Sequence, residues 1–277
     1  MRTRYIQSAN PLLATLAVAA VVTLYWPVLH DMVLTWINNE NDSHGFIVPI
    51  VSTYLIWKRR DRLAAQAVAP NAWGLLGIIG GLVMLLFGWL ASEYFTQRFS
   101  LIIVLSGCII YWYGWPIMAL LAGPVAYLIL MIPIPSILYD SVAFPLKLFV
   151  TKVSVAIMKA LGILVVREGN IMAFPNITLE VVDACSGLRS LMSLLAVGLA
   201  YTMLFVPSMR HKYCIAFLIF PIAIMANLVR VIGTGILSQY FGAAAAEGFF
   251  HEFAGLVIFM TSLLLLVTAH RLLARYF

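Results

Sequence analysis

The stretch LEVVDACSGLRS, residues 179–190, places a cysteine just before a long apolar run. Asp183 and Ser186, which is followed by glycine, predict a turn into a helix, so Cys185 would lie near a helix N-terminus, where the dipole favours the thiolate. Arg189 follows four residues later and can share the same face. A cysteine at a helix start is also often a small packing residue. A free cysteine alone supports both interpretations equally, and the helix-start turn and Arg189 favour the nucleophile.

A single arginine, Arg230, interrupts the apolar stretch AIMANLVRVIGTGIL. Placing a charged side chain within a membrane costs at least about 2.5–3.5 kcal/mol, which makes Arg230 a functional candidate. Asn227 comes three residues earlier and would flank it on one helix face. The alternative is that Arg230 extends its guanidinium to the nearby lipid headgroups.

Two histidines precede apolar runs on the expected outer side. His251 starts the last run in EGFFHEFAG, with Glu247 one turn before it. HEFAG begins like a zinc-protease motif but has Gly255 where the second histidine must stand, so no metal site is predicted. His251 could equally be an interfacial anchor. His44, in DSHG, could orient a substrate, act as a base in place of His251, or end its loop.

A thiol, an imidazole and a guanidinium together suit acyl transfer. The thiolate attacks a carbonyl, the imidazole passes a proton to the leaving amine, and the guanidinium stabilises the oxyanion. Such groups just outside a bilayer would act on a peptide that a membrane-anchored substrate presents there. A reaction through a thioester is therefore the chemistry that these residue types favour.

The elements that must position these residues are membrane helices. The chain has 277 residues, of which 63% are hydrophobic and only 10% charged. Apolar runs of about 18 residues or more recur, and each is long enough to cross a bilayer as a helix. The first run is too long for a signal peptide and is interpreted as a retained span. The expected spans are residues 11–29, 45–57, 72–91, 99–113, 117–133, 187–206, 213–237 and 251–269.

The basic residues orient these eight spans. Basic clusters between apolar runs are typical of cytoplasmic anchors, so the net charge of +6 does not indicate nucleic acid binding. With both termini in the cytoplasm, only Asp61 of the 11 acidic residues lies inside. The basic residues expected inside are Arg2, Arg4, Lys58, Arg59, Arg60, Arg62, Arg210, Lys212, Arg271 and Arg275.

This topology separates the three cysteines. Cys108 falls within a span, and Cys214 begins a span on the cytoplasmic side. Cys185 lies outside, about 30 Å from Cys214 across the bilayer, which is much too far for a disulfide. Cys185 is therefore expected to be a free thiol that faces the exterior.

Residues 134–184 form the longest stretch without an assigned span, and they fall on the outside. Lys147, Lys152 and Lys159 alternate with apolar residues, which favours an interfacial amphipathic helix. The alternative is a ninth span broken at Pro145. The stretches ILVVREGN and ITLEVVDA are rich in β-branched residues and predict a small β-element.

These motifs resemble those of the exosortase/archaeosortase family. EVVDACSGLRS is similar to its cysteine motif, ANLVR to its arginine motif and AEGFFHEFAG to its histidine motif, while NDSHGFIVPIVSTYLIW and VVREGNIMAFPN also match. The resemblance covers nearly the whole chain and implies one integral membrane domain, residues 1–277, with 134–184 as an exterior insertion. It further implies Cys185 as nucleophile, Arg230 as oxyanion stabiliser and His251 as acid/base.

The resemblance also implies a cellular setting. We expect an all-α polytopic protein of the bacterial inner membrane with a periplasmic active site and no cofactor or metal. Its expected partners are the lipid bilayer, an acceptor that the sequence does not identify, and exported proteins. These exported proteins end in a Pro-Glu-Pro motif, a transmembrane helix and a basic tail, and their export is linked to exopolysaccharide.

Three other functions fit the composition. A cysteine protease that releases its product to water would use the same residues. A non-catalytic subunit for polysaccharide export or biosynthesis would bind anionic sugar through Arg230 and the outer lysines, and Cys185 would be dispensable. A pore-forming transporter would need several charges within the membrane, whereas Arg230 is essentially alone.

Overall fold

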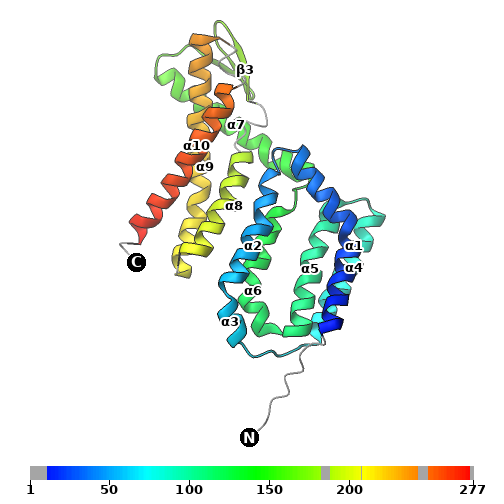
Figure 1. Ribbon diagram of the computed structural model, residues 1–277. Helices are drawn as coiled ribbons and strands as arrows, with labels where there is room; N and C mark the ends of the chain where they lie inside the picture. Colours follow the sequence, from blue (N-terminus) through cyan, green and yellow to red (C-terminus); the bar gives the residue numbers. More distant parts are fainter. Residues whose placement is uncertain (1–10, 182–187, 207, 243–248, 275–277) are drawn as a thin grey trace. The chain divides into compact units, whose positions relative to one another are not determined.

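A computed structural model describes residues 11–181, 188–206, 208–242 and 249–274 (Figure 1). The chain divides into two compact units, Met1–Ile134 and Pro135–Phe277. The boundary falls where the predicted insertion begins. We call them the N-terminal and C-terminal units and describe each by itself.

The N-terminal unit is helical. Its elements are α1 (Pro11–Asn38), the 3-10 turn η1 (Ser43–Phe46), α2 (Ile47–Lys58), α3 (Arg60–Ala65), α4 (Trp73–Leu90), α5 (Tyr94–Tyr113), α6 (Trp115–Tyr127) and the 3-10 turn η2 (Leu128–Met131).

Helix α1 shows why these sequences form membrane helices. Tyr25, Met32 and Trp36 follow one another at helical spacing and are buried. Apolar residues on its other faces stay exposed, including Trp26 with 62% of its surface accessible. A helix that is apolar all round, with only one stripe packed against protein, suits a lipid environment.

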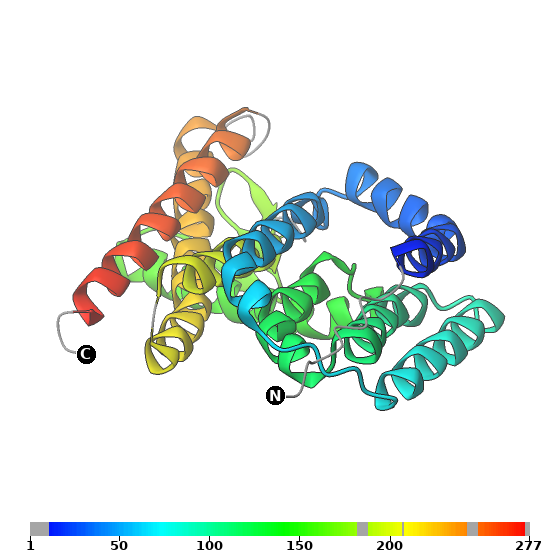
Figure 2. The same ribbon diagram turned by 60° about the horizontal axis from the view of Figure 1, so that its bottom comes forward.

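Helices α4 and α5 run side by side at very short range (Figure 2). A Cβ added to Gly107 would lie 2.6 Å from the backbone nitrogen of Ile78 and 2.9 Å from the carbonyl oxygen of Gly74. Small residues permit this backbone approach, which is a common way for membrane helices to associate. The α4–α5 pair is therefore held by glycine-rich packing.

In its described residues, the C-terminal unit combines four helices with a small sheet. Its elements are α7 (Ser136–Ala160), β1 (Val166–Glu168), β2 (Ile171–Ala173), β3 (Thr178–Glu180), α8 (Leu188–Phe205), α9 (Met209–Phe241) and α10 (Phe249–Leu273). The sheet is antiparallel with strand order β1-β2-β3. Gly169, with φ of +63°, begins the two-residue turn between β1 and β2, where such turns favour glycine.

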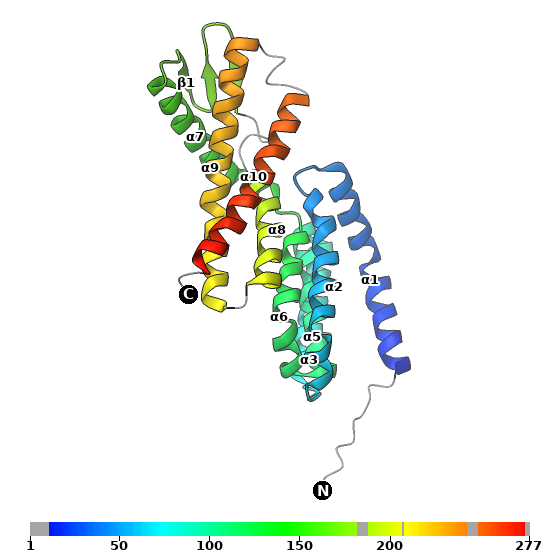
Figure 3. The same ribbon diagram turned by 60° about the vertical axis from the view of Figure 1, so that its left-hand side comes forward.

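Helix α9 is the axis of this unit. Its 33 residues extend about 50 Å at 1.5 Å per residue, well beyond the roughly 30 Å of a hydrocarbon core. Its N-terminal half packs with α8 and α10 through a core of Leu194, Ile215, Ile219, Ala223 and Leu266. Its C-terminal half packs with α7 and the sheet through Val150, Val155, Met158, Val165, Met172, Phe174, Val181, Leu228 and Val231. Figure 3 shows α7 and the strands gathered at that end of α9.

The prediction of an all-α polytopic membrane protein with a small β-element is confirmed. Six helices among the described residues are long and apolar enough to cross a membrane, and α8 and the α6–η2 segment are shorter apolar helices. The span predicted at 45–57 corresponds to α2, which has 12 residues.

Several helices differ from the sequence-based boundaries. Helix α1 continues to Asn38 rather than residue 29, because Met32 and Trp36 still pack against the protein beyond the predicted end. Helix α9 continues to Phe241 rather than residue 237. Helix α7 runs through Pro145 without interruption and is itself long and apolar enough to span a membrane.

Candidate functional site

Arg230 lies against a glycine of the neighbouring helix. A Cβ added to Gly255 of α10 would be 3.4 Å from Nη2 of Arg230 and 3.5 Å from its Cζ. The guanidinium therefore packs where α10 has no side chain. Arg230 is half-buried and lies 21 residues after Met209, or about 32 Å along the helix axis at 1.5 Å per residue. That rise is close to the thickness of a hydrocarbon core.

A small polar pocket adjoins this arginine between α8, α9 and α10. Its polar lining consists of Ser190, Asn227, Arg230 and Ser262, and its volume is about 20 Å³. This is enough room for a single water molecule, which needs about 10–15 Å³. Asn227 is buried, with 2% of its surface accessible, and lies one helical turn before Arg230. The pocket thus brings four polar side chains together among mostly apolar ones.

The other residues predicted to act with Arg230 are described only in part. Cys185, Ser186 and Glu247 lie outside the described residues. The backbone of His251 belongs to the first turn of α10, but its side chain lies outside them too. Arg189 is the second residue of α8 and is half-buried, and the next residue, Ser190, lines the pocket.

His44 lies in the N-terminal unit and is buried, with 8% of its surface accessible. Its Nδ1 lies 3.1 Å from the carbonyl oxygen of Asn41, and the ring also bonds to the backbone of Leu130. Burial lowers the pKa of His44, while the charge of Asp42 and the two backbone bonds act in the opposite direction. The neutral ring is therefore favoured.

The partners of His44 indicate a structural role in this unit. Trp36 donates from Nε1 to the carbonyl oxygen of Met131, at 2.9 Å. Met131 directly follows Leu130, whose backbone His44 contacts. Pro133 and Pro135 follow and have no backbone N–H to offer those carbonyls. The side chains of Trp36 and His44 thus supply hydrogen bonds at the end of η2. Of the three roles left open by the sequence, ending and anchoring its loop fits these contacts.

The structure also reveals a partly buried ion pair that the sequence analysis did not identify. Arg98, with 7% of its surface accessible, donates from Nη2 to Asp31 at 2.7 Å and to Thr35 Oγ1 at 3.0 Å. Its guanidinium carbon lies 5.7 Å from the centre of the Tyr94 ring. Asp31 and Arg98 are 67 residues apart in the sequence. The only signal for the pair in the sequence is that each is a charged residue with apolar residues close by on both sides. A buried arginine needs such a partner, which explains the contact.

Comparison with known protein families shows which family contains these motifs. Residues 36–268 match the transmembrane exosortase family, a range that covers most of the chain. The protein belongs to the exosortase family. Searches of curated proteins and of solved structures gave no match.

The exosortase match includes both compact units. It contains the cysteine, arginine and histidine motifs as well as His44, whereas Asp31 precedes it. Together with the apolar helices, it identifies a multi-pass membrane protein that contacts the lipid bilayer.

Proposed function

We propose that this exosortase is a membrane-embedded cysteine transpeptidase or protease that cleaves the C-terminal sorting signal of exported proteins through a thioester on Cys185. The observation that carries the proposal is the contact between Arg230 and Gly255. Positions 251 and 255 of α10 are one turn apart, a spacing that places residues on one helix face. The contact thus supports a site that combines the arginine and histidine motifs.

Chain connectivity supports including the cysteine motif. Ser190, in the first turn of α8, lines the same pocket as Arg230. Cys185 precedes Leu188 by three residues, which can span at most about 11 Å. This short connection supports a site in which the cysteine motif lies near the arginine and histidine motifs.

The proposed reaction needs only these side chains and the substrate. The Cys185 thiolate attacks the scissile carbonyl carbon and forms a C–S bond, and the guanidinium of Arg230 stabilises the oxyanion. The C–N bond then breaks as His251 gives a proton to the leaving amine. Water or an acceptor amine next attacks the thioester, His251 takes its proton, and the thiol is regenerated.

The remaining polar residues have supporting roles in this proposal. Asn227 lines the pocket beside Arg230 and would keep the guanidinium in position. Arg189 would stabilise the thiolate together with the α8 dipole. Ser186 and Glu247 would orient the groups next to them, while His44 would act only through the fold of the N-terminal unit.

The proposed substrates carry the Pro-Glu-Pro, transmembrane and basic-tail signal that the family resemblance implies. Such a substrate is anchored in the bilayer of the inner membrane and presents its cleavage site on the periplasmic side. A thioester intermediate would allow transfer to an acceptor during export linked to exopolysaccharide.

The proposal is tested by expressing a tagged substrate with wild-type enzyme or with Cys185→Ala. We expect processing to be lost in Cys185→Ala, because the nucleophile is removed. Cys214→Ala provides the control, since this exposed thiol is near the opposite end of α9. The readout is the fraction of substrate shifted on a gel, with enzyme amount measured in the membrane. Normal processing by Cys185→Ala would favour a non-catalytic subunit.

A further inference from the structure

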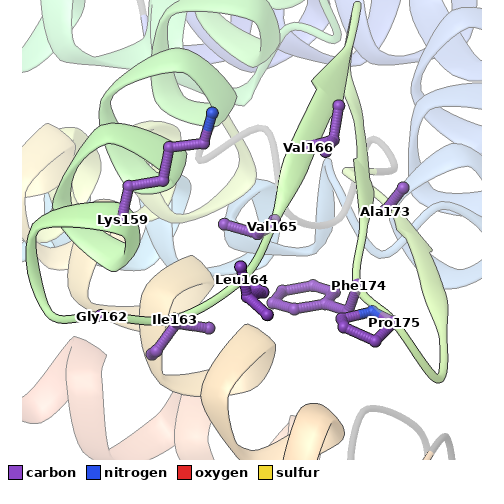
Figure 4. Close-up of a pocket in the computed structure, with 9 residues that line it drawn as sticks. All are labelled: Lys159, Gly162, Ile163, Leu164, Val165, Val166, Ala173, Phe174 and Pro175. Carbon is purple, nitrogen blue, oxygen red and sulfur yellow. The ribbon is translucent and has the colours of Figure 1, made fainter.

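A second pocket, much larger than the one beside Arg230, lies at the C-terminal end of α7. Its volume is about 700 Å³, within the usual range of about 300–1,000 Å³ for ligand sites. Figure 4 shows Lys159, from the last turn of α7, on one side and Phe174 and Pro175, after β2, on the other. We call it the α7–β1 pocket. The proposed reaction does not use it.

The lining of this pocket favours an occupant with a negative charge. Lys159 is the only charged residue among the described residues that line it, and the others are glycine or apolar. Leu164 is 75% accessible beside it. An occupant that complements this lining is apolar and carries one negative group next to its apolar part.

The neighbouring strand favours an extended peptide over a lipid. Among the described residues β1 pairs with β2 alone, so it is an edge of the sheet. An edge strand offers backbone N–H and C=O groups to a further extended segment. The side chains of Val166–Glu168 are all exposed. A peptide could use these backbone groups, whereas a lipid chain could not.

The position of the pocket along α9 relates it to Arg230. Phe174 lies 3.2 Å from where a Cβ on Gly235 would be. Gly235 follows Arg230 by five residues, which is about 8 Å along the helix. Two or three residues of extended chain rise by that amount, at about 3.3 Å each. Along the axis of α9 the pocket thus lies about 8 Å beyond Arg230, but on another face of the helix, because five residues turn it by about 140°.

We propose that the α7–β1 pocket is a recognition site for the protein substrate. It binds an extended segment in which an acidic side chain pairs with Lys159 and adjacent proline or aliphatic side chains contact Leu164, Phe174 and Pro175. This inference rests on the proposed function, and Lys159 acts as a specificity-determining residue in it.

The test is a charge exchange between enzyme and substrate. Lys159→Glu should lower the processing rate of the native substrate by about tenfold or more, because like charges then meet in the pocket. A substrate whose signal carries arginine in place of its glutamate should be processed slowly by the wild type. The same substrate should be processed substantially faster by Lys159→Glu than by the wild type.

Two further variants make the result specific. Lys152 is exposed two turns earlier on α7 and does not line the pocket, so Lys152→Glu should process both substrates as the wild type does. Ala173→Phe fills the pocket and should slow both substrates while the enzyme still accumulates in the membrane. Normal processing by Ala173→Phe would contradict the inference.

The outcomes also separate this inference from the proposed function. Cleavage by the wild type combined with unchanged cleavage by Lys159→Glu overturns the recognition site alone. An equal loss on both substrates, without rescue, overturns the peptide pairing and indicates a lipid headgroup instead. A substrate left intact by the wild type contradicts both the proposed function and this inference.

Discussion

At the scale of single residues, the guanidinium of Arg230 is the best-defined group of the candidate site. Arg230→Lys keeps the charge but loses the planar fork that can hold an oxyanion with two donors. We predict that this variant processes a tagged substrate about 10²–10³-fold more slowly, the usual loss when one oxyanion donor is removed. The processing rate is measured by gel shift at equal enzyme amounts.

Arg210→Lys is the matched control for that experiment. Arg210 is exposed in the first turn of the same helix, at the opposite end from the pocket. The Arg210→Lys variant should therefore process the substrate at the wild-type rate. Near-normal conversion by Arg230→Lys would leave Arg230 as a membrane anchor and remove the oxyanion role.

His44 gives a pH dependence with a definite sign. Burial lowers the pKa of His44, and Asp42 and the two backbone bonds only partly offset this. The unfolded chain takes up the proton at about pH 6.5, so stability is full above that pH and falls as the pH drops toward the folded pKa. We predict a smaller loss of thermal stability between about pH 7.5 and 5.5 for His44→Gln in detergent. An unchanged pH dependence would contradict this assignment.

Residue types could be predicted from the sequence, but their partners could not. The cost of an arginine in an apolar helix was enough to single out Arg230. Its contact with Gly255 depends on how α9 and α10 pack, which no local pattern encodes. The same holds for Asp31 and Arg98, and for the carbonyls that His44 and Trp36 contact.

At the scale of elements, the α4–α5 pair depends on glycine at its contact. Gly107→Ala would place a Cβ 2.6 Å from the backbone nitrogen of Ile78, and backbone cannot easily move aside. We predict that Gly107→Ala destabilises the protein by about 1–3 kcal/mol, as overpacking typically does. The thermal midpoint in detergent measures the effect.

Gly80 offers a control on the same pair of helices. A Cβ at Gly80 meets nothing within 4 Å, so Gly80→Ala should be neutral or slightly stabilising, because alanine favours a helix over glycine. Equal destabilisation by both substitutions would show that tight packing is not what holds the α4–α5 pair together.

Helix existence was easier to predict than helix length. Each predicted span corresponds to a helix because apolar runs of that length have few alternatives in lipid. The ends of α1 and α9 extend beyond the apolar runs, since packing within each unit continues there. The small sheet could be predicted from the two stretches rich in β-branched residues that flank residues 171–176, and β1, β2 and β3 form there.

At the scale of the whole molecule, the distribution of basic residues predicts the orientation. Reporter fusions after Arg62, Lys212 and Phe277 should give cytoplasmic signals, and fusions near Gly169 and Gly248 should give exterior signals. A cytoplasmic signal near Gly169 would place the sheet and the α7–β1 pocket on the wrong side for periplasmic substrates. It would contradict the predicted topology.

The central claim is that the protein cleaves its substrates through Cys185. Mass spectrometry of the C-terminus of a tagged substrate, recovered from cells with wild-type enzyme or Cys185→Ala, tests it most directly. We predict that the wild type yields a substrate shortened at its sorting signal, ending in a free carboxylate after hydrolysis or carrying the mass of an acceptor after transfer. In Cys185→Ala cells the signal should remain intact. The same shortened C-terminus in both strains would contradict the claim.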